Sequence, residues 1–253
     1  NCSELKIASL SLKDSHLNLH GNDNHLGIRM DYDNQTELEN SGEIILHGSF
    51  ERDEDGLGIG LDFLPSSIRF NSKEWSFEPS ELFYKNNDLD VKTFALVSGN
   101  ERISIEGKAS QNKADTLNLN LEHFDISIAD HILKQDFGTK GLATGTVQLT
   151  SPLNDKGILV DMICDSTSFA STPLGTLNIG SRWNDADKGF EIYVRNELEG
   201  KNNIDAYGTL KSDGRMLDIT ADLDRLDVSY AHPFLDEIFS EMEGKISGRI
   251  DVN

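Results

Sequence analysis

The sequence predicts an all-β protein built from repeated hairpins. Apolar and polar residues alternate over short runs such as 117–121, which is the period of a strand with one apolar face. Glycine is plentiful, with 21 residues, and Asn, Asp and Ser fill the gaps between the apolar runs, as expected for many tight turns. Only 37% of the residues are hydrophobic, so we expect the apolar side chains to form rows on a sheet rather than a thick core.

The first fifty residues contain a series of short predicted strands. Turn-forming residues separate them at Asp14-Ser15, at 21–24 and at 40–42. Because the apolar residues alternate, each strand should have one apolar and one wet face. The predicted strands lie at 5–7, 10–12, 17–19, 26–32 and 45–50.

Three glycines, Gly48, Gly107 and Gly208, mark a hairpin that recurs along the chain. Each is followed by a polar turn and then by an alternating return strand that starts at Leu57, Leu117 or Leu217. These hairpins would place apolar side chains in rows, and we expect the rows to line a groove. The groove candidates are Leu57, Ile59, Leu61, Phe63, Leu117, Leu119, Leu121, Ile219 and Leu223.

The segments between the hairpins, 68–96 and 158–194, alternate as well, and each carries one tryptophan, Trp75 or Trp183. A tryptophan on an apolar strand face more often packs than recognises a ligand, so packing is the favoured interpretation. Two short helices are predicted at 129–137 and 233–242, and helices of this length should plug or flank the sheet because they are unstable alone.

The pattern of residues 117–149 reappears from Ile219. Phe124-Asp125-Ile126-Ser127 is matched by Leu226-Asp227-Val228-Ser229, and the glycine-containing end at 141–149 is matched by 244–252. Such an internal echo is typical of repeat architectures, in which each unit covers the apolar face of its neighbour. We therefore divide the chain into N-terminal strands at 1–44 and repeat regions at 45–152 and 153–253.

The charge excludes one class of partner. The formal charge is -21, which repels nucleic-acid phosphates and anionic lipid head groups, so we expect no nucleic-acid partner. No stretch is long enough to span a membrane, and no signal peptide is evident. Because the chain begins with Asn1 and stops in a strand-like run, we expect it to be part of a longer protein. Cys2 and Cys164 are too few for a disulfide framework, and Cys164 should be a small buried apolar residue.

We find no motif for catalysis, for a cofactor or for a metal. There is no nucleophile elbow, zinc-protease motif or phosphate loop, and Gly56-x-Gly58-x-Gly60 should instead thin one face of a strand. His16, His20 and His25 with Asp23 are too widely spaced on strands for metal binding. The acidic loops at Asp53 and Asp185 lack the closing acid of a calcium site and are better explained as turns. An enzyme is therefore not expected.

The repeated unit resembles the TamB family, the translocation and assembly module proteins of the Gram-negative envelope. The resemblance extends over residues 45–253, and the run SEMEGKISGRIDVN at 240–253 carries it best. It implies an elongated, curved, open trough of β-sheet called a β-taco. It also implies a periplasmic protein that is anchored to the inner membrane through a segment outside this sequence. The implied partners are an outer-membrane Omp85-type barrel protein and a cargo, either a client β-barrel protein or a phospholipid.

Three classes of function remain open at this point. An open apolar lane could hold acyl chains or client strands, as in protein secretion, outer-membrane biogenesis or lipid transport. A structural spacer or stalk would share the same repeats but seal its interior. A carbohydrate-binding or hydrolytic β-protein would need an aromatic platform or a carboxylate pair, and Trp75 and Trp183 are far apart in sequence.

Overall fold

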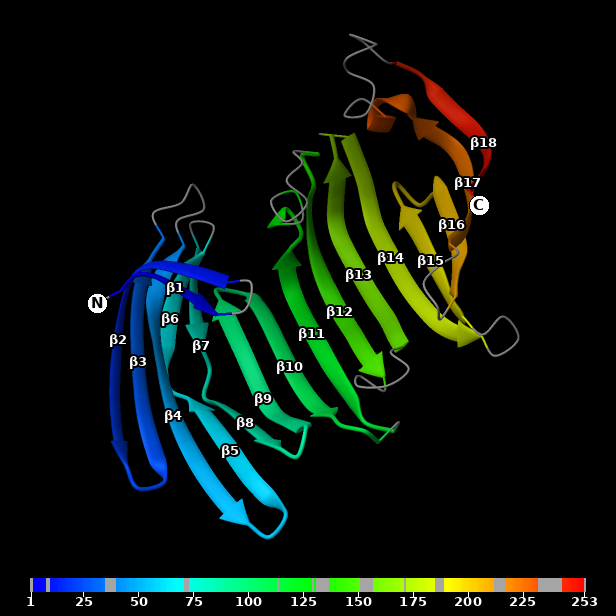
Figure 1. Cartoon of the computed structure of the whole chain (residues 1–253). Coiled ribbons are helices and arrows are strands. Elements are labelled where there is room, and N and C mark those ends of the chain that lie inside the picture. Colours follow the sequence, from blue (N-terminus) through cyan, green and yellow to red (C-terminus); the bar gives the residue numbers. More distant parts are fainter. Residues whose placement is uncertain are drawn as a thin grey trace. The chain divides into compact units, whose positions relative to one another are not determined.

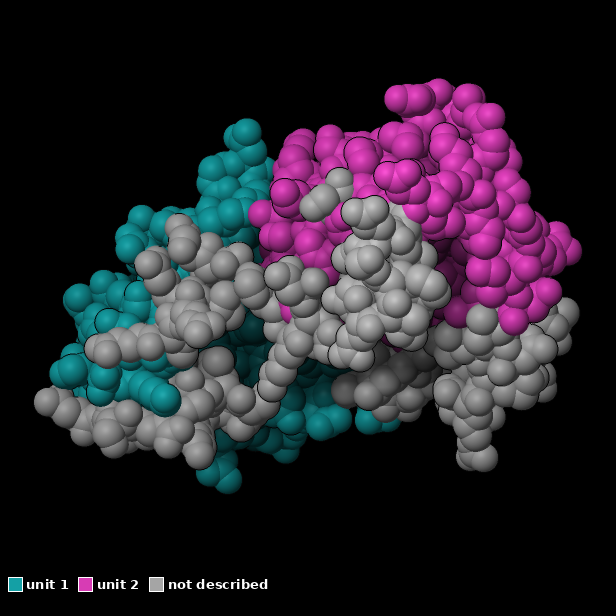
Figure 2. All heavy atoms as spheres, turned by 90° about the horizontal axis from the view of Figure 1, so that it is seen from above, with its two compact units in different colours: residues 1–119, 151–154 teal, residues 120–150, 155–253 magenta. Residues whose placement is uncertain are grey.

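The computed structural model shows a chain of strands joined by turns. It describes residues 2–7, 10–34, 40–70, 73–112, 114–128, 130, 137–150, 157–170, 172–184, 189–211, 217–231 and 243–252. The chain divides into two compact units, unit 1 with residues 1–119 and 151–154 and unit 2 with residues 120–150 and 155–253 (Figure 2). Within the described ranges, no helix has the length and apolar character needed to cross a membrane.

The all-β prediction is confirmed, and the strand pairs are antiparallel (Figure 1). The strands of unit 1 are β1 (Cys2–Ile7), β2 (Leu10–Asn22), β3 (His25–Asp33), β4 (Ser41–Asp53), β5 (Gly56–Phe63), β6 (Ser66–Phe70), β7 (Lys73–Phe77), β8 (Ser80–Lys85), β9 (Asp88–Ser98) and β10 (Glu101–Ala109). The strand β11 (Thr116–Asp125) begins in unit 1 and ends in unit 2.

The strands of unit 2 follow one another in chain order (Figure 1). They are β12 (Lys140–Thr150), β13 (Gly157–Phe169), β14 (Thr172–Asn184), β15 (Gly189–Glu197), β16 (Ile204–Lys211), β17 (Leu217–Asp227) and β18 (Lys245–Val252). Each pairs with the next, from β12–β13 to β17–β18. A single 3-10 helix, η1 (Val228–Ala231), follows β17.

Unit 1 departs from this simple order between β4 and β9. The N-terminal end of β4 pairs with β6, and the rest of β4 pairs with β5. In turn, β5 pairs with β8 and β6 pairs with β7, and both β7 and β8 pair with β9. Two short strand pairs, β5–β8 and β6–β7, therefore fill the same gap in the sheet.

The buried side chains of unit 1 gather where these two pairs meet. Trp75 is 6% exposed and Phe77 is 7% exposed. The ring of Phe77 stacks on Phe63 with centroids 5.7 Å apart, and Phe94 packs edge-on against both rings. Aromatic contacts of this kind add to the stability gained by burying the rings. The expectation that Trp75 packs is confirmed.

Two of the three predicted hairpins appear with full registers. Gly48 on β4 lies opposite Leu61 on β5, and Gly208 on β16 lies opposite Ile219 on β17. For the third hairpin, β10 and β11 are neighbours in the sheet, and a side chain at Gly107 would lie 2.2 Å from the carbonyl oxygen of Thr116. The recurring glycine therefore lies against the apolar return strand.

The internal repeat has a counterpart in the hydrogen bonds. The backbone N–H groups of Ser127 and Ser229 donate to Oδ1 of Asp125 and Asp227, at 3.0 and 2.9 Å. The next matched pair, Ile126 and Val228, donates to the carbonyl oxygens of Gly141 and Gly244 at 3.1 Å in each case. The same turn therefore closes the strand after β11 and after β17.

The two expected short helices at 129–137 and 233–242 fall almost wholly outside the described residues. Besides strands, turns and η1, the described part of the chain holds helical conformation at Ile128 and Asp130, and only the all-β part of the prediction is confirmed. The division into 1–44, 45–152 and 153–253 is based on sequence similarity and stays a prediction. The glycine interpretation of β5 is confirmed, because a side chain at Gly58 would lie 2.8 Å from the ring of Phe83.

Candidate functional site

One face of unit 2 carries a continuous apolar row that crosses all of its strands from β12 to β18. Residues directly opposite each other in an antiparallel pair share a face, so the strand registers define the row. Its members are half-buried, apart from Ile250, which is 48% exposed. They are Gly145, Met162, Ile179, Val194, Ala206, Ala221 and Ile250.

The groove candidates Ile219 and Leu223 belong to the rows on either side of this one. Ile219 lies opposite Gly208 and Val252, and Leu223 lies opposite Ile204 and Gly248. Both side chains are half-buried. The sequence therefore placed these two residues on the correct face of the sheet, which we call the apolar face.

A hydrogen bond between side chains shows to which face of the sheet the groove candidates on β11 point. Thr146 Oγ1 donates to Asn120 Oδ1 at 2.9 Å, so both residues lie on the same face. Thr146 alternates with Gly145 and Val147, whose side of β12 is the apolar face. Leu119 and Leu121 flank Asn120 and therefore point to the apolar face, where both are half-buried.

The candidates on β5 lie in comparable rows within unit 1. Leu61 belongs to a row that crosses from β2 to β10, with Leu26 and Gly48 on one side and Leu82 and Val91 on the other. Ile59 and Phe63 belong to the flanking rows and are half-buried, as is Leu117 at the start of β11. Leu57, near the start of β5, is 52% exposed.

The candidates are thus shared between the units. Those from Leu57 to Leu119 lie in unit 1, and Leu121, Ile219 and Leu223 lie in unit 2. Ile59, Leu61, Ile219 and Leu223 have mainly apolar or glycine neighbours across the sheet, whereas Leu57 lies opposite Arg52. That the candidates line a groove stays a prediction. In the described part of unit 2, the buried apolar side chains are Ala143, Cys164 and Phe190, so most of the apolar face is only partly covered. A sheet face of this kind can accept further apolar groups.

The opposite face of unit 2 is polar and crossed by ion pairs. Arg195 pairs with Asp205 at 2.9 Å, and Arg249 donates from Nε and Nη2 to both carboxylate oxygens of Asp222, at 2.8 and 2.9 Å. The hydrogen bond from Arg249 lowers the pKa of Asp222 below its ordinary value. These pairs are exposed and stabilise little individually, but they keep this face charged and hydrated.

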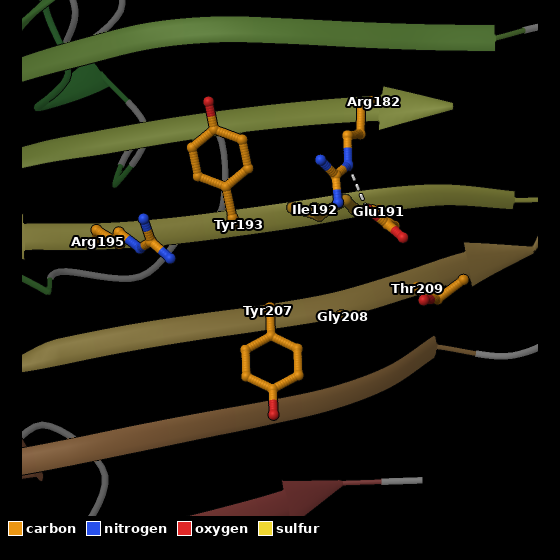
Figure 3. Close-up of a pocket in the computed structure, with 8 residues that line it drawn as sticks. All are labelled: Arg182, Glu191, Ile192, Tyr193, Arg195, Tyr207, Gly208 and Thr209. Atoms are coloured by element: carbon orange, nitrogen blue, oxygen red, sulfur yellow. Dashed lines mark hydrogen bonds and ion pairs between the residues drawn. The ribbon is translucent and has the colours of Figure 1, made fainter. Parts of the chain in front are cut away.

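The polar face also contains a hollow of about 520 Å³, which we call the tyrosine hollow (Figure 3). Tyr193 and Tyr207 are directly opposite each other on β15 and β16 and line it together with Arg182, Glu191, Arg195 and Thr209. The sequence-based search for an aromatic platform considered only tryptophans and missed this pair. The signal available was that each tyrosine occupies a polar-face position of an alternating strand.

A second hollow, of about 240 Å³, lies where η1, the β15–β16 turn and the starts of β14 and β18 meet. Lys201, Arg225 and Lys245 line it, and we call it the basic hollow. Within the described ranges these three cations make no salt bridge, whereas Arg182, Arg195 and Arg249 on the polar face are all paired. Glu199 and Asp227 also line the hollow, which leaves one net positive charge there in a chain of charge -21, so an anion is favoured locally.

Hydrogen bonds between β14 and η1 hold the walls of the basic hollow. Thr172 Oγ1 and Ser229 Oγ are 2.7 Å apart, and the hydroxyl of Tyr230 donates to the carbonyl oxygen of Pro173. The backbone N–H and hydroxyl of Ser229 hold the pKa of Asp227 below its ordinary value, and Lys245 adds to this. The hollow therefore contains an ionised carboxylate beside its cations.

The basic hollow begins close to the end of an apolar row. Leu226 lines the hollow and follows Leu223 after a β-bulge in β17. The bulge adds a residue between them, so that Leu223 lies opposite Gly248 while Leu226 lies opposite Ile246. Apolar side chains and unpaired cations thus occur within a short stretch of one strand.

The remaining sequence-based expectations have mixed outcomes. Cys164 is buried at 3% exposure, as predicted, and burial raises the pKa of its thiol. Trp183 packs edge-on against Phe190 but remains 43% exposed, so its packing is partial. The turn at Asp53 is confirmed, because its Oδ1 accepts from the N–H of Asp55, while the Asp185 turn lies outside the described residues. Among the described residues, no group of three ligands is placed to hold a metal.

No family model matches this chain, and no curated protein or solved structure matches it either.

Proposed function

We propose that the chain is a non-enzymatic segment of a TamB-like envelope-biogenesis protein whose apolar face carries apolar cargo between the inner and outer membranes. The cargo is the acyl part of a phospholipid or the apolar side chains of a client β-barrel strand. The protein would be periplasmic, with its inner-membrane anchor outside this sequence and an Omp85-type barrel as its outer-membrane partner.

The observation that carries this proposal is the half-exposed apolar row from Gly145 to Ile250. A row that crosses every strand of unit 2 gives a cargo chain the same apolar surroundings from one strand to the next. Neighbouring strands are about 4.8 Å apart, so the steps along the row are short compared with an acyl chain. Cargo that moves along such a row exchanges one apolar contact for another at little cost.

The basic hollow favours the phospholipid form of the cargo. Lys201, Arg225 and Lys245 offer charged donors to a phosphate group, and Leu226 connects the hollow to the apolar residues of β17. Lysine and arginine are the usual protein partners of phosphate oxygens. A client β-strand has no chemical need for such a site.

Photocrosslinking in cells tests the apolar face directly. A crosslinking amino acid at Ile219 lies on the apolar face, and the same amino acid at Thr220 is the matched control on the polar face. We expect adducts at position 219 and none at position 220, with the adduct mass distinguishing a lipid from a barrel protein. Equal labelling at both positions, or none at position 219, would contradict the proposal.

Charge reversal tests the choice of phospholipid. Lys245→Glu should reduce lipid adducts at position 219, whereas Lys140→Glu, at an exposed lysine outside the basic hollow, should leave them unchanged. If both variants behave like the parent protein, the apolar face remains the proposed cargo site, but the basic hollow takes no part in binding the cargo.

A sealed structural spacer is the competing function. A charged residue at Leu119 separates the two, because Leu119 is half-buried on the apolar face. A Leu119→Glu protein that folds normally but fails to support outer-membrane assembly favours the lane. A Leu119→Glu protein that unfolds favours the spacer.

A further inference from the structure

The tyrosine hollow lies on the polar face, away from the rows that the cargo proposal uses. Tyr193 is 39% exposed and Tyr207 is 49% exposed, although both sit in the middle of their strands. The two rings keep apolar surface in contact with water on a face that is otherwise charged. Their presence needs a separate explanation from the apolar face.

The two rings lie in opposite directions. The ring of Tyr193 extends over β14, and the ring of Tyr207 extends from β16 toward β17 (Figure 3). Tyr193 can lie so low because Gly180 is beneath it: a side chain at Gly180 would come within 2.1 Å of its Cζ. One aromatic surface is thus laid almost flat against the sheet, and the hollow opens between the two rings.

Charged groups surround the rings, and they are paired with each other. Arg182 donates to Glu191, as the dashed line in Figure 3 marks, and Arg195 donates to Asp205. Because each cation has an anion beside it, the hollow has no excess of either charge. The paired groups still hold further donors and acceptors, since a guanidinium has five N–H groups and a carboxylate has four lone-pair sites.

The aromatic rings and the paired charged groups together indicate which class of ligand fits the tyrosine hollow. An anion would have to compete with Glu191 and Asp205, which already pair with the two arginines of the tyrosine hollow. A purely apolar ligand would leave the further donors and acceptors of these arginines and carboxylates unsatisfied. A sugar ring satisfies both requirements, because its C–H face packs on an aromatic ring while its hydroxyls donate to carboxylates and accept from guanidinium groups.

We propose that the tyrosine hollow binds an uncharged carbohydrate chain, with Tyr193 and Tyr207 as stacking surfaces and Arg182, Glu191 and Arg195 as hydroxyl partners. The hollow, at about 520 Å³, falls within the range of about 300–1,000 Å³ for small-molecule sites. A protein partner is less well suited, because Tyr193 lies flat and does not project as an anchor. The proposal is independent of the cargo function, since it uses the other face.

Binding of defined oligosaccharides to the full chain tests the inference. The probes are cellopentaose, maltopentaose and chitopentaose, measured by titration calorimetry and by ligand-observed NMR. We expect at least one of them to bind, and Tyr207→Ala to weaken that binding by about tenfold, the range of one aromatic contact.

The matched control is Tyr84→Ala, which removes a tyrosine of similar exposure, 45%, from unit 1. It should leave carbohydrate binding unchanged. Arg182→Gln should weaken binding without changing the melting temperature, because the Arg182–Glu191 pair is exposed. The melting temperature of each variant shows whether the fold is intact.

Two results would overturn the inference. One is that none of the three probes binds the parent protein. The other is binding that survives both Tyr207→Ala and Arg182→Gln, which would place the sugar elsewhere. A crosslinker at Tyr207 that captures a protein while no probe binds would assign the hollow to a protein partner instead.

Discussion

Ser229 donates its backbone N–H to Oδ1 of Asp227 at 2.9 Å, and the same turn recurs between Ser127 and Asp125 at 3.0 Å. An aspartate that accepts from the N–H two residues ahead stabilises a tight turn without help from the sheet. The turn ends β17 and fixes the start of η1, which forms part of the basic hollow. The two copies of the repeat therefore share the turn that ends the strand as well as the alternating apolar residues.

Replacing Asp227 should make stability depend on pH in a predictable way. The hydrogen bonds from Ser229 lower the pKa of Asp227, so the stabilisation is present above the unfolded-state pKa and is lost as pH falls through the folded-state pKa. We expect Asp227→Ala to cost about 1 kcal/mol at pH 7, the value of one hydrogen bond. Thermal unfolding should show the difference shrinking below about pH 4.

The control for Asp227 is Asp218→Ala, at an exposed aspartate of the same strand whose carboxylate has no hydrogen-bond or ion-pair partner among the described residues. It should change stability little at either pH. A constant difference between the parent and Asp227→Ala from pH 7 to pH 3 would contradict the assigned role.

Asn196 is expected to be the most sensitive polar residue of unit 2. It is 1% exposed, accepts from the backbone N–H groups of Asn203 and Ile204 at 2.8 and 2.7 Å, and donates to the carbonyl oxygen of Leu174 at 3.0 Å. Asn196→Ala leaves these backbone groups unsatisfied, which should cost about 2–3 kcal/mol. Urea unfolding followed by circular dichroism measures the loss.

Asn178→Ala, on the polar face of neighbouring β14, is the matched control for Asn196. We expect it to stay within about 0.5 kcal/mol of the parent protein. If the two substitutions cost the same, the hydrogen bonds of Asn196 have no special value.

Gly175 and Gly200 allow a steric clash to be separated from backbone strain. Both have left-handed φ values, 78° and 71°. A side chain at Gly175 would meet the carbonyl oxygen of Glu197 at 2.0 Å, whereas at Gly200 nothing lies within 4 Å. Gly200→Ala should therefore cost only about 1–2 kcal/mol for the left-handed conformation.

Gly175→Ala should cost clearly more than Gly200→Ala in the same urea experiment, because the backbone of β15 must also move. Equal losses would mean that β14 and β15 separate easily at this point, contrary to their close approach.

Cys164 is expected to be unreactive in the folded protein. Its side chain is 3% exposed, and burial raises the pKa of the thiol, so less thiolate forms at neutral pH. In a Cys2→Ser background, an aromatic disulfide reagent should react with Cys164 only after denaturant is added. Fast labelling without denaturant would show that this part of β13 opens readily.

Much of the fold follows from residue patterns that extend over a few positions. The alternation of Leu117, Leu119 and Leu121 predicts a strand and places the three on one face, because side chains alternate along any strand. Gly48 and Gly208 predict hairpins for a similar reason, since the turn and the return strand are close in sequence. The groove candidates were found in this way.

The pairing of strands that are distant in sequence was not predictable in the same way. The insertion of β6–β7 beside β5–β8 depends on which end of β4 each strand pairs with, and no local pattern encodes that choice. The position of Asn196 in a buried site was also missed, because an asparagine near a turn normally remains exposed.

The sequence alone determined that this chain forms antiparallel strands with one apolar side, because alternation and turn chemistry act over neighbouring residues. The tertiary structure determined which polar and charged side chains lie close together in the two hollows. Tyr193 lies opposite Tyr207, and Lys201, Arg225 and Lys245 line one hollow, only because strand register and the fold of η1 bring distant residues together. Register depends on the sum of many cross-strand contacts, so it exists only once the sheet has formed.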